Sequence, residues 1–142
     1  MAILKDGTDE YEVRIKRYPD GTYFDEYVST REREKSEVRN CDRFIIGEGD
    51  VTYTIDMTLK KGFNFVGYSH VRARLYIPGQ EDSVSCIDLP RPLKIKKKTT
   101  IADVSESMKY ADVVVGDRKM LQTRFAFRSL VPGELLHYIV HT

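Results

Sequence analysis

The sequence predicts an all-β domain, an antiparallel β-sandwich of about eight to ten strands with a jelly-roll-like or immunoglobulin-like arrangement. Three observations predict it: apolar and polar residues alternate along several segments, short apolar runs recur, and turn-forming residues separate these segments. The length of 142 residues is that of one domain. We therefore expect residues 1–142 to form a single β-sandwich domain.

The alternation is typical of strands with one buried and one solvated face. In VTYTIDMTL, the apolar residues from Val51 to Leu59 occupy every second position, and threonines and Asp56 stand between them. The same pattern of period two is found in EYEVRIKRY (10–18), HVRARLYI (70–77) and, less cleanly, QTRFAFRSL (122–130).

Short apolar runs and turn signals complete the predicted strand order. Further extended segments are expected at 43–47, 83–89, 92–104, 111–116 and 135–141. YPDGTY at 18–23 is a strong turn, because Pro19 presets φ and Asp20-Gly21 tolerates positive φ. Other turns are expected at 60–67, 77–83 and 116–119.

One segment departs from the pattern. STREREKSEVRN at 29–40 is almost entirely charged or polar and has no apolar stripe. We expect it to form a solvated loop or one short exposed helix.

Charge and cysteine content restrict the class of protein. The net charge of +1 provides no general attraction for nucleic acid or an anionic membrane, and no apolar run is long enough to span a bilayer. The segment MAILKDGTDEYE lacks the apolar core of a signal peptide. Two cysteines, Cys41 and Cys86, are few for a disulfide-stapled secreted domain. We therefore expect an intracellular protein, cytoplasmic or nuclear, with free thiols, although a single disulfide stays open.

Motifs for catalysis or metal binding are absent from the sequence. It has no Gly-x-Ser-x-Gly elbow, no phosphate-binding glycine loop, no Cys-x-x-Cys pair and no His-Glu-x-x-His motif. His137 and His141 would lie about 13 Å apart on a strand, which is too far to share one ion. The sequence thus predicts a protein that is not an enzyme and that holds neither a metal nor a cofactor.

Basic residues provide one candidate binding surface. Lys94, Lys96 and Lys98 would share one face of an extended segment. Such a row of lysines either protects an exposed edge strand from pairing or binds an anion. Four arginines could extend the surface if their strands lie side by side: Arg72, Arg74, Arg124 and Arg128.

The stretch KKGFNFVGYSH provides a second candidate. It reads as a wide loop between strands, and Gly62 and Gly67 allow its bends. Phe63, Phe65 and Tyr68 are expected to fold over the open end of the core. Alternatively, they form an aromatic platform for a peptide, sugar or base beside Arg72 and Arg74.

The order of these segments resembles a fungal family of intracellular, single-domain β-sandwiches whose function is unknown. The resemblance rests on RFIIGEGDVTYTIDMTLKKGFNF, VRARLYIPGQ and TRFAFRSL. The matching positions are Phe44, Ile46, Val51 to Leu59, Phe63, Phe65, Val71 to Gly79 and Phe125 to Leu130. The chain lacks any tryptophan. The resemblance implies a fold but no catalytic or binding residue.

Three functions are open at this point. The first is a non-enzymatic module that binds another protein or itself, with a homodimer as one case, through strand edges or the arginine faces. The second is binding of an anionic ligand (nucleic acid, phosphoinositide or sulfated glycan) through the lysines and arginines. The third is carbohydrate binding by Tyr68 and neighbouring aromatic residues.

Overall fold

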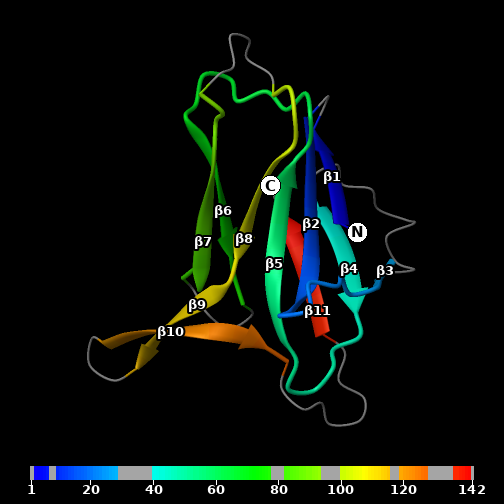
Figure 1. Cartoon of the computed structure of the whole chain (residues 1–142), viewed down its shortest axis with the longest axis vertical. Coiled ribbons are helices and arrows are strands. Elements are labelled where there is room, and N and C mark those ends of the chain that lie inside the picture. Colours follow the sequence, from blue (N-terminus) through cyan, green and yellow to red (C-terminus); the bar gives the residue numbers. More distant parts are fainter. Residues whose placement is uncertain are drawn as a thin grey trace.

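The computed structural model describes residues 2–6, 9–28, 40–77, 82–93, 100–115, 119–127 and 136–141. These residues form eleven strands and no helix (Figure 1). The strands are β1 (Ala2–Asp6), β2 (Asp9–Tyr18), β3 (Glu26–Val28), β4 (Asn40–Ile45), β5 (Thr52–Leu59), β6 (His70–Leu75), β7 (Ser85–Pro90), β8 (Val104–Met108), β9 (Tyr110–Val115), β10 (Lys119–Ala126) and β11 (Leu136–His141).

Every pairing between these strands is antiparallel, so the predicted fold class is confirmed. The sandwich arrangement and the single domain stay predictions. The charged segment expected at 29–40 lies outside the described residues except for its last residue, which begins β4. The turns expected at 77–83 and 116–119 also lie mostly outside them.

The strands form three sheets. The largest has the order β1-β2-β5-β10-β9, and β8 pairs with β5; the others have the orders β11-β4-β3 and β6-β7. β5 is the centre of the largest sheet, and one of its edges is shared. Thr52 and Tyr53 pair with β10, whereas the segment from Ile55 to Leu59 pairs with β8.

The alternation predicted for residues 51–59 separates an apolar face of β5 from a polar one. The polar face was expected to be solvated, but no residue of β5 is exposed and Thr54 is only 4% exposed, because neighbouring segments cover both faces. Ile55, Met57 and Leu59 contribute to the apolar clusters, whereas Thr54 and Asp56 form polar contacts with each other. β2 aligns with β5 so that Ile15 lies opposite Ile55, which brings the apolar faces of the two strands together.

The core consists of three clusters of buried side chains. One joins Leu59 and Leu89 with Phe63 and Phe65. Another joins strand β4 to β2 through Ile15, Phe24, Ile45 and Phe127, and the third contains Val84, Met108, Ala111 and Phe125. Each fully buried side chain of this size contributes about 1.5–3 kcal/mol, so these clusters hold the two small sheets against the large one.

The turn predicted at 18–23 is confirmed. The Arg17 N–H donates to the carbonyl oxygen of Thr22 at 2.7 Å, and Gly21 has a φ of 78°. The turn returns the chain along β2, where Tyr23 forms an isolated bridge with Lys16. It therefore places the Tyr23 ring beside the polar side chains of β2 and β5.

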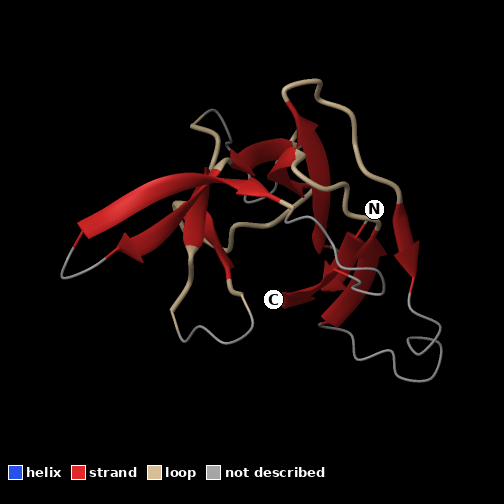
Figure 2. Cartoon of the chain, turned by 90° about the horizontal axis from the view of Figure 1, so that it is seen from below, coloured by secondary structure: helices blue, strands red, loops and turns tan. Residues whose placement is uncertain are grey.

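The hairpin of β9 and β10 extends away from the other strands (Figure 2). We call this hairpin the arm.

β8 was not expected as a separate strand. Ile77, the last apolar residue of the alternating segment 70–77, follows the end of β6 and is exposed, so the strand is shorter than the alternation predicted. Within the described ranges, no helix is long and apolar enough to cross a membrane.

Candidate functional site

The aromatic loop between β5 and β6 has an inner and an outer side. Phe63 and Phe65 are buried and meet edge to face at 5.2 Å between ring centroids, and Tyr11 packs on Phe63 in the same way at 5.1 Å. These two phenylalanines confirm the expectation that the loop closes the core. The expectation was wrong for Tyr68, which is 72% exposed, because the chain turns outward after Phe65.

Backbone hydrogen bonds fix the loop to neighbouring segments. The Gly62 N–H donates to the carbonyl oxygen of Thr100 at 2.9 Å, and the Thr100 N–H donates back to Phe63 at 2.9 Å. The Asn64 N–H donates to the Asp9 carboxylate at 2.9 Å. The loop is therefore anchored both by its buried rings and by its backbone.

The outer side of the loop carries an unusual valine. Val66 has a φ of 49°, in a region that β-branched residues rarely adopt. Its N–H donates to the Asn64 side-chain oxygen at 2.9 Å, which closes a local turn. The strained turn directs an apolar side chain into solvent.

Four large apolar side chains are exposed on the loop between β5 and β6 and on the described segments that follow β7 and precede β8, and these segments lie together at the top of Figure 1. Their exposed fractions lie between 66% and 103%, and they belong to Val66, Tyr68, Leu93 and Ile101. Tyr68 and Leu93 line a hollow of about 340 Å³ together with Arg91. Ile101 follows Thr100, which is hydrogen-bonded to the loop. We call these four residues and Arg91 the end surface.

Arg91 reaches the end surface because its N–H donates to the carbonyl oxygen of Ser69 at 2.8 Å, continuing the pairing of β6 with β7. Its guanidinium has no hydrogen bond or ion pair with another residue in the described part of the chain. Sequence reasoning missed Arg91, since its position beside Tyr68 depends on the register of this hairpin.

The predicted arginine surface is only partly present. Arg72 donates two hydrogen bonds to Asp88, at 2.7 and 2.9 Å, which hold the pKa of the Asp88 carboxyl below its ordinary value. Arg74 is exposed and has no such partner among the described residues. Because β6 and β10 belong to different sheets, Arg72 and Arg74 do not lie on a strand beside Arg124.

Arg124 stacks on two tyrosines rather than facing solvent freely. Its guanidinium carbon lies 4.0 Å from the centroid of Tyr18 and 5.0 Å from that of Tyr110. The remaining candidates, Lys94, Lys96, Lys98 and Arg128, lie outside the described residues.

Ser69, His70 and Asp88 contain the residue types of a catalytic triad, but their geometry differs from one. The Ser69 hydroxyl and His70 Nδ1 are 2.9 Å apart, whereas His70 Nε2 lies 3.9 Å from Asp88. That second distance is too long for a hydrogen bond, and Arg72 occupies the carboxylate. The three groups therefore do not form a working relay in this arrangement.

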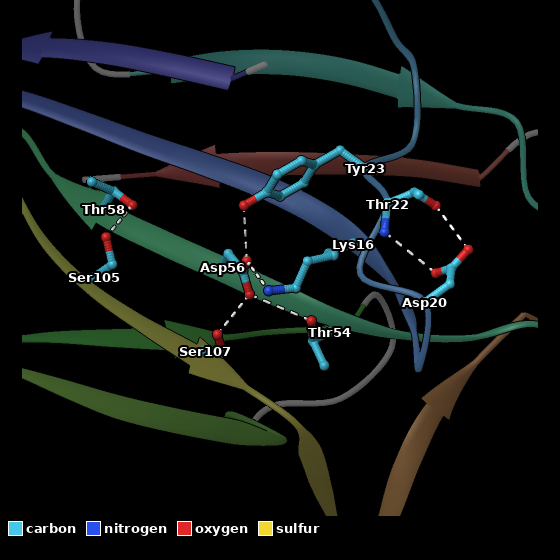
Figure 3. A network of polar contacts seen from close by, with 9 residues as sticks. All are labelled: Lys16, Asp20, Thr22, Tyr23, Thr54, Asp56, Thr58, Ser105 and Ser107. Atoms are coloured by element: carbon cyan, nitrogen blue, oxygen red, sulfur yellow. Dashed lines mark hydrogen bonds and ion pairs between the residues drawn. The ribbon is translucent and has the colours of Figure 1, made fainter.

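The polar face of β5, opposite the face with Ile55 and Met57, carries a compact network of hydrogen bonds centred on Asp56 (Figure 3). The Lys16 ammonium lies 2.7 Å from this carboxylate, and the Ser107 hydroxyl donates to it at 2.6 Å. Hydroxyl groups of Tyr23 and Thr54 also donate to it, at 3.2 and 3.4 Å. Three strands, β2, β5 and β8, thus contribute to one hydrogen-bonded cluster.

The network shifts two pKa values in opposite directions. The hydrogen bond to Asp56 raises the pKa of Lys16 above its ordinary value. Burial alone would raise the pKa of Asp56, but hydrogen bonds from Lys16, Ser107 and Tyr23 together outweigh it and lower this pKa. Both groups therefore stay charged at neutral pH.

A hollow of about 520 Å³ lies over this network. We call it the polar hollow. Its wall comes from β7, β9 and β10, and its lining residues are Lys16, Tyr23, Asp56, Thr58, Ser85, Cys86, Ile87, Ser105, Glu106, Ser107, Met108, Lys109, Tyr110, Asp112 and Gln122. Thr58 and Ser105 share a hydrogen bond of 2.7 Å at its base. The alternation of Thr54, Asp56 and Thr58 marked this face as polar, but nothing local in the sequence indicated that β8 lies beside it.

Cys86 is exposed and its thiol is free. The side chain of Cys41 lies outside the described part. In the same part of the chain, no three side chains of His, Cys, Asp or Glu come together as ligands for a metal ion.

No protein-family model, curated protein or solved structure matches this chain. The resemblance to a fungal family therefore stays a prediction, and a function has to be argued from the residues themselves.

Proposed function

We propose that the chain is a protein-interaction module and that its end surface binds an extended segment of a partner protein. The observation that carries this proposal is the exposure of Val66, Tyr68, Leu93 and Ile101 at one end of the molecule. A cluster of exposed apolar side chains with polar surroundings is typical of a binding site.

The composition of the end surface supports a protein as the ligand. Tyrosine and arginine are the residue types that most often dominate binding energy at interfaces. Tyr68 and Arg91 both line the same small hollow, which has room for an apolar side chain of the partner. The guanidinium of Arg91, which has no partner among the described residues, favours a partner segment that also carries a carboxylate.

Anchoring of the loop supports tight binding. Phe63 and Phe65 are fixed in the core, and the hydrogen bonds of Thr100 hold the backbone at Gly62 and Phe63. Ordering a flexible loop costs free energy on binding, so a loop that is already ordered retains more of the interaction energy.

Selection from a random peptide library displayed on phage tests the proposal. We expect enriched peptides with an aromatic or aliphatic residue near an Asp or Glu. Tyr68→Ala and Arg91→Ala should each weaken such a peptide about tenfold or more, because truncation of a central interface residue costs at least about 1–2 kcal/mol. Tyr76→Ala is the matched control, since Tyr76 is an exposed tyrosine beyond the other end of β6.

The proposal fails if no peptide is enriched. It also fails if the selected peptides bind the Tyr68 and Arg91 variants as well as they bind the wild type. Circular dichroism and thermal unfolding of each variant separate a lost contact from a lost fold.

Self-assembly through the arm is a second candidate, favoured by a separate observation. Val113 and Leu121 lie directly opposite each other on the arm, and both are exposed. A two-stranded hairpin is only marginally stable in water by itself. The Asp112 N–H donates to Val84, away from β10, so alternation turns the Val114 amide outward as well. A second copy could pair with this edge.

Light scattering coupled to size exclusion tests self-assembly. We expect the mass to rise toward that of a dimer with concentration and to resist high salt, because the contact is apolar. Replacing both Val113 and Leu121 with lysine should return the mass to that of a monomer, whereas Thr123→Lys, on an exposed residue of the same strand, should not. A monomer at every concentration would exclude this candidate.

The other expectations receive less support from the described residues. Of the arginines expected to bind anions, Arg74 alone is described and has no partner among the described residues, because Arg72 is paired with Asp88 and Arg124 stacks on tyrosine rings. A carbohydrate site at Tyr68 would share the end surface with the peptide proposed above. The absence of catalysis and the intracellular location stay predictions.

A further inference from the structure

The polar hollow lies apart from the end surface and takes no part in the function proposed above. We propose that it binds a neutral, hydroxyl-rich small molecule of the mono- or disaccharide class. Its volume of about 520 Å³ falls within the range of about 300–1,000 Å³ that is usual for small-molecule sites.

The lining groups fit a ligand that both donates and accepts hydrogen bonds. Hydroxyl groups come from serine, threonine and tyrosine: Tyr23, Thr58, Ser85, Ser105, Ser107 and Tyr110. A hydroxyl that donates to a neighbour still has two lone pairs that accept. Ser107 and Tyr23 donate to Asp56, so both present acceptors to a ligand. The Gln122 side chain adds a donor and an acceptor with no partner among the described residues.

Charge in the hollow disfavours an anion. The carboxylates of Asp56, Glu106 and Asp112 outnumber the ammonium groups of Lys16 and Lys109. Lys16 is also neutralised by Asp56 at 2.7 Å. A phosphate or sulfate would therefore meet a net negative charge, whereas a neutral ligand is not repelled by it.

The base of the hollow is ordered before a ligand arrives. Ser107 and Asp56 are joined at 2.6 Å, and Thr58 and Ser105 at 2.7 Å. The guanidinium carbon of Arg14 lies 3.5 Å from the centroid of the Tyr23 ring, which fixes that ring in position. The partly exposed rings of Tyr23 and Tyr110 offer apolar surface for the C–H groups of a sugar.

Titration followed by ¹H–¹⁵N NMR tests the proposal with maltose, cellobiose and lactose as probes. At least one of them should shift the amides of residues 56–58 and 105–112 and saturate at millimolar concentration. Thr58→Val and Ser107→Ala should each weaken this binding about fivefold or more. Thr22→Val is the matched control, because the Thr22 hydroxyl pairs with Asp20 at 2.9 Å outside the hollow (Figure 3).

Gln122→Ala and Asp112→Ala keep the test decisive if a network variant is unstable. Both side chains line the hollow without a hydrogen bond to another described residue, so their loss should weaken binding without unfolding the chain. The proposal is overturned if none of the sugars shifts these amides or if the shifts survive in all four variants. Tighter binding of inositol hexakisphosphate at the same amides would overturn it too. Tyr68→Ala should leave sugar binding unchanged, which separates this test from that of the end surface.

Discussion

One face of β5 packs into the core, and the other carries hydrogen bonds that reach the polar hollow. Ile55, Met57 and Leu59 contact apolar residues on several strands. Asp56, on the other face, forms an ion pair with Lys16 and accepts a hydrogen bond from Ser107. Burial is not directional, whereas a hydrogen bond needs its partner in place. We therefore expect the apolar face to contribute most of the stability, and the polar face to depend on matched pairs.

The largest expected effect is on the apolar face. Leu59 is fully buried, so Leu59→Ala should lower the free energy of unfolding by about 2–5 kcal/mol, through lost burial and the cavity left behind. Urea denaturation measures it. Leu93→Ala is the matched control, because Leu93 is fully exposed and its loss should change stability by less than about 0.5 kcal/mol. Equal effects of the two substitutions would contradict the assignment of Leu59 to the core and of Leu93 to the surface.

An intermediate effect is expected on the polar face. Asp56→Ala removes the acceptor for Lys16 and Ser107 and should cost about 1–2 kcal/mol. If the pair acts as a unit, Lys16→Met should cost less in the Asp56→Ala background than in the wild type. A double-mutant cycle measures this difference. Strictly additive effects would show that the two side chains do not depend on each other.

The same carboxylate predicts a dependence on pH. Because the folded chain lowers the pKa of Asp56, the unfolded chain binds more protons near pH 3–4, about the ordinary range of the group. Its contribution is therefore present above that ordinary pKa and is lost as the pH falls through the folded value. Wild type should lose more stability than Asp56→Asn between about pH 5 and 2, as measured by denaturant unfolding. If the free energy of unfolding of the two proteins fell in parallel with pH, Asp56 would not be the cause of the pH dependence.

The smallest effect is expected for an ion pair that lies open to solvent. Arg72 and Asp88 form a bidentate ion pair between β6 and β7, and both side chains are nearly half exposed. Water and salt screen such a pair, so Asp88→Asn should leave the thermal midpoint unchanged within error. A clear loss of stability at low salt would show that the exposed fraction of these two side chains does not predict how much their ion pair contributes to stability.

Much of the fold follows from local patterns in the sequence. The alternation from Val51 to Leu59 predicts which residues of β5 share a face, but not that the polar face is covered as well. The turn at 18–23 needs only its Pro-Asp-Gly sequence. The burial of Phe63 and Phe65 could be predicted because leaving large, wholly apolar rings in water is unfavourable. Strand β8 could not be predicted this way, since VSESM has apolar residues only at Val104 and Met108. Its conformation depends on pairing with β5, where Met108 lies opposite Ile55.

The candidate sites were less predictable than the fold. Tyr68 was expected to be buried with the two phenylalanines, but the turn at Val66 directs it outward. The arginine surface required β6 and β10 to be neighbours, and strand order is not encoded in any short segment. The network beneath the polar hollow includes a hydrogen bond between Asp56 and Ser107, which are 51 positions apart in the sequence. No local sequence pattern predicts this contact.

The shared edge of β5 has a consequence for the order of folding. Hairpins β1–β2, β6–β7 and β9–β10 join strands that are close in sequence, and such hairpins form within about 1–10 μs. β5 pairs with β2, β8 and β10, all distant in sequence, so it can join them only after long loops have closed. We expect folding of the whole chain in milliseconds to seconds, limited by the arrival of β5 between hairpins that are already formed.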